Sequence, residues 1–153
     1  MSKFIENISI LQNNTFVLTP LIVSFFKNLK PSDNNLLLAY FVFPLVLNHE
    51  FVEKIKQLRS TSSLSRITKD KDIMAGFEER FYYYREQTNK CLQYAIDCKY
   101  IEIDKKLRVL VIHDENMITD ARLNKNMNIA SQLYKIFTKN IINTYYAFGI
   151  KAL

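Results

Sequence analysis

The alternation of apolar and polar positions along the chain predicts a series of helices with one pair of short strands between them. The first apolar region, 14–30, is expected to form a helix. Its start has two interpretations: Thr19 caps a helix that begins at Pro20, or Asn14 caps a longer helix that bends at Pro20. A polar turn is expected to follow at 31–35.

The next segment, 36–47, is LLLAYFVFPLVL, and it carries no charge. A helix that is apolar all round is enclosed on several sides rather than laid on a surface. We therefore expect this run to be largely buried. Pro44 should end or kink it near 41–43, because the residue before a proline avoids helical geometry.

Two short helices are predicted after this run. Asn48 is expected to cap a helix over 49–59. The Ser/Thr-rich segment 61–69 predicts a second short helix. The apolar residues expected to face the core from these two helices are Phe51, Ile55, Leu58, Leu64 and Ile67.

A longer apolar stripe recurs at spacings of three and four residues through 72–100. It predicts either one long helix or two helices with a joint near Tyr84. The stripe consists of Met74, Phe77, Phe81, Tyr84, Thr88, Cys91, Leu92, Ala95 and Ile96.

The period changes at 100–112, where YIEI and LRVLVI predict two strands. We expect a three-residue hairpin loop between them, made of Asp104, Lys105 and Lys106. A last helical region is predicted over 121–148, with Gly149 as its C-cap. Its apolar stripe consists of Met127, Ala130, Leu133, Phe137, Ile141, Tyr145 and Phe148.

The predicted fold class is mainly α with a small β-hairpin, in a single domain over 1–153. Only two glycines and three prolines interrupt the chain, which favours helices over a many-turned β-sandwich. Helix, helix and hairpin over 61–112 is the order of a winged helix-turn-helix, and C-terminal helices over 121–148 follow it. This is an analogy of fold, which gives no function by itself.

The formal net charge is +6, from 21 Lys and Arg against 15 Asp and Glu, and it favours an acidic partner such as nucleic acid. Candidate DNA contacts gather around the hairpin: Lys99, Lys105, Lys106 and Arg108. Cations on a wing hold phosphates without reading base sequence. The alternative is that a charged hairpin tip keeps its edge strands from aggregating.

The inventory of reactive residues argues against an enzyme. Gly76 and Gly149 lie too far apart to form a glycine-rich phosphate loop. The two histidines form no zinc-binding motif, and Cys91 falls on the apolar stripe, where a small core residue is expected. We therefore predict no catalytic residue, no cofactor and no metal site.

The cysteines and the apolar runs bear on location. On one helix, Cys91 and Cys98 would lie about 10 Å apart, too far for a disulfide, so both are expected to be reduced. The N-terminal MSKFIENISIL lacks the continuous apolar core of a signal peptide. No apolar run reaches the roughly 20 residues that a membrane span needs. A soluble, cytoplasmic protein without a membrane partner is expected.

Tyrosines form two unusual groups. Tyr82, Tyr83 and Tyr84 are consecutive, so on a helix they spread over about 200° and cannot all be buried. Tyr84 fits the apolar stripe, which leaves Tyr82 or Tyr83 exposed for a protein interface or for stacking on bases. We favour the protein interface. Tyr145 and Tyr146, near the C-terminus, have the same interpretation.

Six segments follow one another along the chain: NNTFVLTPLIVSFF, LLLAYFVFPLVLNHEFVEKI, RSTSSLSRI, ERFYYYREQTNKCLQYAIDCKYIEID, ASQLYKIF and YYAFGIKAL. In this order and spacing they resemble the middle component of three-component ABC ATPase systems. The P-L-V-L element and the terminal aromatic-Gly-Ile close are the most similar parts.

The resemblance implies a non-enzymatic subunit of a bacterial defence operon, placed between an SMC-like ABC ATPase and an effector, often a nuclease. The best-known such assembly is Lamassu, which acts against phages and plasmids, and double-stranded DNA would be met through the complex. The family is associated with a winged-helix-like core. The glycine-poor hairpin departs from the pattern, which puts a shared role of its tip in doubt. The alternative hypothesis is a free-standing winged-helix DNA-binding protein, such as a transcriptional regulator.

The resemblance also gives the apolar run a second interpretation. Its end, with Phe43, Pro44, Leu45 and Leu47, would be held against the ATPase subunit, or the whole run would be internal core. With the exposed tyrosines, the candidate partner interface is Phe43, Pro44, Leu45, Leu47, Tyr82, Tyr83, Tyr145 and Tyr146.

Overall fold

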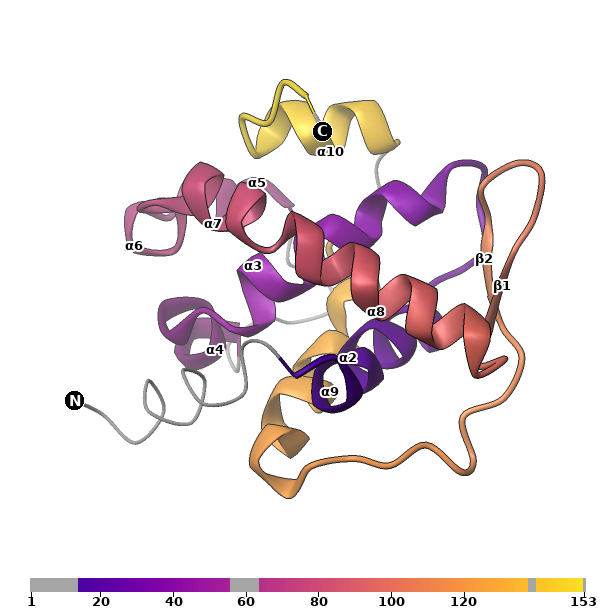
Figure 1. The fold of residues 1–153 in the computed structure, drawn as a ribbon. Coiled ribbons are helices and arrows are strands. Elements are labelled where there is room, and N and C mark those ends of the chain that lie inside the picture. Colours follow the sequence, from indigo (N-terminus) through magenta and orange to yellow (C-terminus); the bar gives the residue numbers. More distant parts are fainter. Residues whose placement is uncertain (1–13, 56–63, 138–139, 153) are drawn as a thin grey trace.

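The computed structural model describes residues 14–55, 64–137 and 140–152, which are mostly helical (Figure 1). Helix α2 (Thr15–Asn28) packs against α8, α9, β2 and α3, and its residues 18–23 are all buried. The side-chain oxygen of Asn14 accepts a hydrogen bond from the Val17 N–H at 3.2 Å, and Pro20 lies inside the helix. Of the two interpretations of its start, the longer helix capped by Asn14 is therefore confirmed.

The apolar run forms the 3₁₀ helix η1 (Asn35–Phe41) and then α3 (Val42–Val46). The change between them falls where the proline was expected to interrupt the run. Pro44 lies in the first turn of α3, where a missing N–H breaks no intrahelical bond. Side chains at 41–47 are all buried, which confirms the expected enclosure.

An aromatic cluster holds this run in the core. The Phe41 ring lies against five others, with centroid separations from 4.8 to 6.3 Å. These rings come from α7 and from the C-terminal part of the chain, and they are Phe77, Phe81, Phe137, Tyr145 and Phe148. Segments far apart in sequence therefore meet around Phe41.

Two short helices follow as expected. Helix α4 (His49–Ile55) is capped by Asn48, whose side-chain oxygen accepts from the Phe51 N–H at 3.0 Å. Helix α5 (Leu64–Thr68) buries Leu64 and Ile67. The predicted Leu58 and the rest of the first helix lie outside the described residues.

The long stripe is divided among α6 (Lys71–Met74), α7 (Phe77–Tyr83) and α8 (Arg85–Asp97). The joint at Tyr84 confirms the two-helix interpretation of its C-terminal part. Gly76, with φ +66°, separates α6 from α7 in a conformation that residues with a Cβ rarely adopt.

One member of the predicted stripe does not face the core. Ile96 is exposed, because Ala95 takes the buried position and consecutive helix positions are about 100° apart.

Strands β1 (Ile101–Ile103) and β2 (Val109–Val111) pair antiparallel, with Glu102 opposite Leu110. The Asp104 N–H donates to the Arg108 carbonyl oxygen at 3.1 Å, so the loop consists of 105–107. The predicted loop, 104–106, was therefore wrong by one position. Leu107 has φ +56° and fills the left-handed position that closes such three-residue loops, usually taken by glycine.

The last helical region is broken into η2 (Ala121–Leu123), α9 (Asn124–Ala130), η3 (Leu133–Lys135) and α10 (Ile141–Ala147). Gly149 has φ +73°, and its N–H donates to the Tyr146 carbonyl oxygen at 3.0 Å, which confirms the C-cap. Helix α10 and the loop between β2 and η2 lie at opposite ends of the molecule in Figure 1. The predicted class, mainly α with a small β-hairpin, is confirmed.

Within the described residues, no single helix is long and apolar enough to cross a membrane. Two consecutive helical segments, Asn35–Val46 and His49–Ile55, reach that length and apolar composition when they are counted together. The chain bends by 94° between them.

Candidate partner-binding surfaces

Helix α10 carries two strongly exposed apolar side chains. Ile142 is 68% exposed and Tyr146 is 76% exposed, and the two lie one helical turn apart. Beside them is a cavity of about 480 Å³, which we call the α10 groove. Its lining residues are Leu37, Ile141, Ile142, Tyr145, Tyr146, Ile150, Lys151 and Ala152.

Two tyrosines fix the walls of the α10 groove. The Tyr145 hydroxyl donates to the Leu37 carbonyl oxygen at 2.7 Å, and the Tyr82 hydroxyl donates to the Ala152 carbonyl oxygen at 2.7 Å. Burial, and then the nearby Tyr40 and Tyr82 hydroxyls, raise the pKa of Tyr145 well above its usual range. The bond from its hydroxyl to the Leu37 carbonyl holds this wall in place before any partner arrives.

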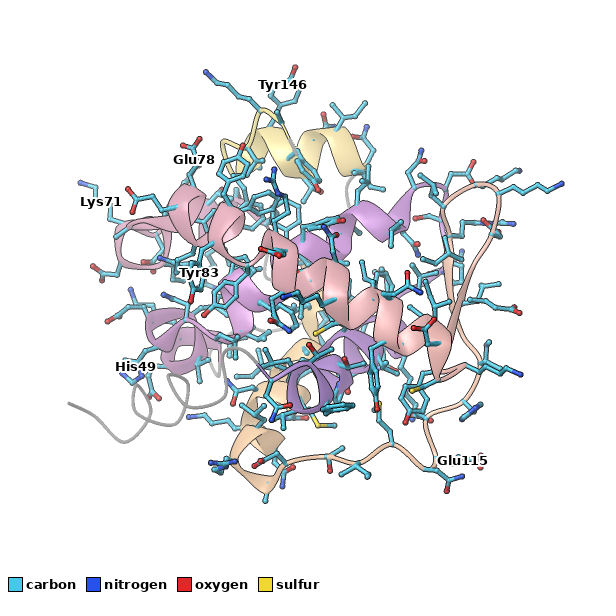
Figure 2. The ribbon with its side chains drawn as sticks, in the orientation of Figure 1. His49, Lys71, Glu78, Tyr83, Glu115 and Tyr146 are labelled. Carbon is cyan, nitrogen blue, oxygen red and sulfur yellow. The ribbon has the colours of Figure 1, made fainter. Side chains whose placement is uncertain are left out.

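The structure brings three of the predicted interface tyrosines to this groove and leaves one elsewhere. Tyr82, Tyr145 and Tyr146 contact or line it. Tyr83 is 58% exposed, but it lies well away from Tyr146 in Figure 2, with its ring edge-on to Tyr84. The four residues therefore do not form one surface.

The structure does not support an interface at the end of the apolar run. Phe43 and Leu45 have no exposed surface, Pro44 is buried and Leu47 is 6% exposed. A side chain enclosed by the chain's own core offers no area to a partner. This burial favours the other interpretation, in which the whole run is core.

A second apolar surface, which we call the Phe16 surface, lies where α2 begins. Phe16 is 67% exposed, Ile118 is 87% exposed, and both line a cavity of about 270 Å³. The Phe16 ring meets that of Tyr94 edge-on, with 5.0 Å between centroids. Other residues of this lining include Val17, Pro20, Tyr100 and Met117.

The sequence patterns missed the Phe16 surface for two reasons. Phe16 is one apolar residue in a helix that is apolar almost all round, and Ile118 stands in a polar loop. The only available signal was Ile118, an apolar residue without periodic neighbours.

The cations of the hairpin differ in whether they are paired with a carboxylate. The Arg108 Nε lies 2.7 Å from the Asp104 carboxylate, which also accepts the Lys106 and Arg108 backbone N–H groups at 2.9 and 3.0 Å. These bonds, led by that of the Arg108 backbone, hold the pKa of Asp104 below its usual value. Arg108 is thus paired across the base of the loop, whereas Lys99, Lys105 and Lys106 are exposed.

The hairpin tip is also fastened to the start of η1. The Asn34 N–H donates to the Lys106 carbonyl oxygen at 2.8 Å, and the Leu36 N–H donates to that of Leu107 at 3.1 Å. The buried Asn35 side-chain oxygen accepts from the Val109 N–H at 2.8 Å. We call these three bonds the hairpin latch. They hold the lysines of the tip on an anchored loop.

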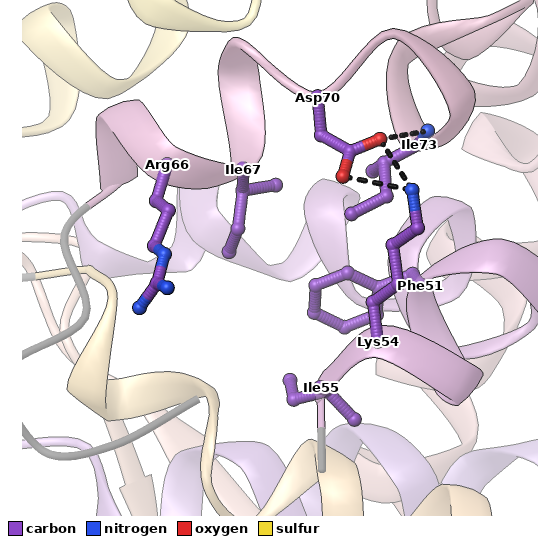
Figure 3. A pocket seen from close by; sticks show the side chains of 7 residues that line it. All are labelled: Phe51, Lys54, Ile55, Arg66, Ile67, Asp70 and Ile73. Carbon is purple, nitrogen blue, oxygen red and sulfur yellow. Dashed lines mark hydrogen bonds and ion pairs between the residues drawn. The ribbon is translucent and has the colours of Figure 1, made fainter. Parts of the chain in front are cut away.

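A cavity of about 330 Å³ between α4 and the α5–α6 pair is drawn in Figure 3. The Lys54 ammonium lies 2.9 Å from the Asp70 carboxylate and 3.0 Å from that of Asp72. The hydrogen bond to Asp70, the larger cause, raises the pKa of Lys54, and that bond lowers the pKa of Asp70. Both shifts favour the ionised pair, so Lys54 stays protonated and its charge is neutralised locally.

Other potentially reactive groups, in the part of the chain that the structure describes, also lack an arrangement that would bind a metal or activate a side chain. No group of three or more His, Cys, Asp or Glu there is placed to hold a metal ion. Burial raises the pKa of the Cys91 thiol, which keeps it protonated at neutral pH. The His113 ring packs edge-on against Tyr100.

The chain was compared with models of known protein families. The family described as MC3, ABC-three component (ABC-3C) system Middle Component 3, matches residues 1–152. The chain matches no curated protein and no solved structure.

Proposed function

Because the chain belongs to the Middle Component 3 family of ABC-three component systems, we propose that it is a non-catalytic subunit that bridges an SMC-like ABC ATPase and an effector. The complex would be a Lamassu-like defence assembly in the cytoplasm, acting against phages or plasmids, with a nuclease as effector. Family membership implies protein partners. The finer roles are our inference.

The observation that carries the proposal is the presence of two separate apolar surfaces. The α10 groove lies at one end of the molecule, and the loop that bears Ile118 lies at the other (Figure 1). Exposed apolar surface of this kind marks sites of protein interaction. Two such surfaces far apart allow one small subunit to contact two partners at once.

The direct test is co-expression of the chain with the products of its two neighbouring genes. We expect all three to co-purify, and we expect the association of ATPase with effector to be lost when this chain is omitted. An ATPase and an effector that bind each other equally well without it would contradict the bridging role.

We further propose that the hairpin contacts duplex DNA within the complex, in the manner of a wing that follows α7 and α8. Lys105 and Lys106 on the anchored tip would hold phosphates, with Lys99 and Arg108 beside them. Replacing both tip lysines with Glu should weaken DNA binding by the complex. It should also lower the slope of log affinity against log salt concentration by about 2, because two phosphate contacts are lost. Unchanged retention of DNA across salt would contradict this contact.

A free-standing DNA-binding regulator is the second candidate, and the exposed lysines of the hairpin favour it. It predicts that the isolated chain binds duplex DNA with a preference for sequence. DNA binding alone uses neither of the two exposed apolar surfaces, whereas the bridging subunit uses both.

A further inference from the structure

The α10 groove is apolar with a cationic edge. Among its lining residues, Lys151 is the one that carries a charge. A second cation lies close by, because the Arg85 guanidinium is placed over the Tyr82 ring at 6.0 Å, and Tyr82 in turn bonds to Ala152 of the lining. Within the described ranges, neither Lys151 nor Arg85 has a carboxylate at ion-pair distance. The groove therefore favours a ligand with apolar and acidic groups together.

The backbone around the groove disfavours an extended ligand. A strand that docks by β-augmentation needs free N–H and C=O groups at the edge that it joins. The carbonyls of Leu37 and Ala152 already accept the tyrosine hydroxyls, and helical hydrogen bonds occupy the backbone of α10 away from its ends. A helical ligand needs no such groups, and Ile142 and Tyr146 offer it side chains one turn apart.

A second copy of this chain fits the groove poorly. In a two-fold symmetric contact the α10 groove of one copy would face the α10 groove of the other. Lys151 and Arg85 of the first copy would then approach Lys151 and Arg85 of the second, which are also cations. The whole chain also carries a net charge of +6. Charge complementarity selects a different, acidic molecule.

We propose that the α10 groove is the docking site for an acidic amphipathic helix of one partner subunit. Apolar side chains of that helix would pack on Ile142 and Tyr146, and its Asp or Glu residues would face Lys151 and Arg85. This inference rests on the proposed function, since it assigns one of the two bridging contacts to one surface.

The main test measures the affinity of the purified chain for each neighbouring-gene product, tagged and immobilised. Ile142→Asp and Tyr146→Ala should each weaken the binding of one product by about thirty-fold, the scale of interface hot spots. The matched control is Ile118→Asp, the same substitution on the Phe16 surface, at a position that is 87% exposed against 68% for Ile142. It should change the affinity for that same product by less than about two-fold.

The acidic nature of the helix is tested separately. Lys151→Glu and Arg85→Glu should reduce the association rate and flatten its dependence on salt, because exposed charges at a rim mainly steer encounter. Arg85 lies in the first turn of α8, where an acidic residue is compatible with the helix dipole. A photo-cross-linking residue at position 146 should attach to a segment of the bound neighbouring-gene product. That segment should have apolar residues at the three- and four-residue spacing of a helix and several Asp or Glu residues.

The outcomes separate this inference from the proposed function. If the unaltered chain binds both products and the α10 variants bind them equally well, the inference fails and the bridging role survives. If the unaltered chain binds neither product, both fail. A cross-link to a basic segment would overturn the acidic helix. So would a concentration-dependent dimer, detected by sedimentation, that Ile142→Asp dissociates.

Discussion

The apolar run 36–47 and helix α10 are similar in composition and opposite in exposure. Both are rich in aromatic and aliphatic residues, and they touch each other through the Phe41 and Tyr145 rings, 4.8 Å apart. Phe41 is enclosed by aromatic rings from distant segments, whereas Ile142 and Tyr146 face outward. Apolar composition therefore does not distinguish core from interface; the arrangement of distant segments decides it.

The largest effect should come from the centre of the run. Phe41→Ala removes a fully buried ring and should lower the free energy of unfolding by about 3–5 kcal/mol, because the aromatic cluster cannot close over the cavity. Urea denaturation of the isolated chain measures it. The matched control is Phe16→Ala, where the same ring is 67% exposed and a loss of about 1 kcal/mol or less is expected. Equal losses would remove the contrast between the two regions.

An intermediate effect is expected in the hairpin latch. Asn35→Ala leaves the Val109 N–H without its acceptor and should cost about 1–3 kcal/mol of unfolding free energy. Asn34→Gly is the control, because Asn34 has φ +63° and its backbone N–H survives the change. It should shift stability by about 0.5 kcal/mol or less. A neutral Asn35→Ala would show that the latch contributes little.

A smaller effect should appear only in acid, at the exposed loop beside the Phe16 surface. Side-chain and backbone hydrogen bonds from Arg122 lower the pKa of Asp120 to about 2, from an ordinary value of 3.8. The unfolded chain thus binds more protons between these pH values, so the stabilising contribution is present above pH 3.8 and is lost as the pH falls towards 2. Asp120→Asn should flatten the fall in thermal midpoint over this window. An unchanged profile would contradict the pairing.

The smallest effect on folding should be at Tyr146. Tyr146→Ala removes a side chain that is 76% exposed, so the free energy of unfolding should change by about 0.5 kcal/mol or less. The same denaturation measurement checks this, and it shows whether any loss of partner binding by this variant is due to the surface alone. A loss as large as that of Phe41→Ala would place Tyr146 in the core instead.

Local signals in the sequence predicted the ends of elements well. Asn14, Asn48 and Gly149 cap helices through hydrogen bonds or backbone angles within a few residues. Their capping roles can therefore be predicted without knowledge of the fold. The joint at Tyr84 was likewise indicated by the pattern around it.

Features that depend on contacts between distant segments could not be predicted from the sequence. Leu107 adopts the left-handed region while its carbonyl binds Leu36, seventy-one positions earlier in the chain, and no local pattern shows that contact. The exposure of Ile142 and the assembly of Phe16 with Ile118 depend on how whole helices dock. For the same reason the sequence left the end of the apolar run open to two interpretations.

The short helix η1 has a consequence for how the molecule responds to load. Leu36 is bonded to the hairpin tip and the adjacent Leu37 to the groove wall, through the Leu107 carbonyl at 3.1 Å and the Tyr145 hydroxyl at 2.7 Å. Tip and wall are thus anchored at neighbouring residues of the same short helix. A pull on the tip lysines would therefore be passed through η1 to the wall that Tyr145 forms, so the hairpin tip and the α10 groove are mechanically coupled.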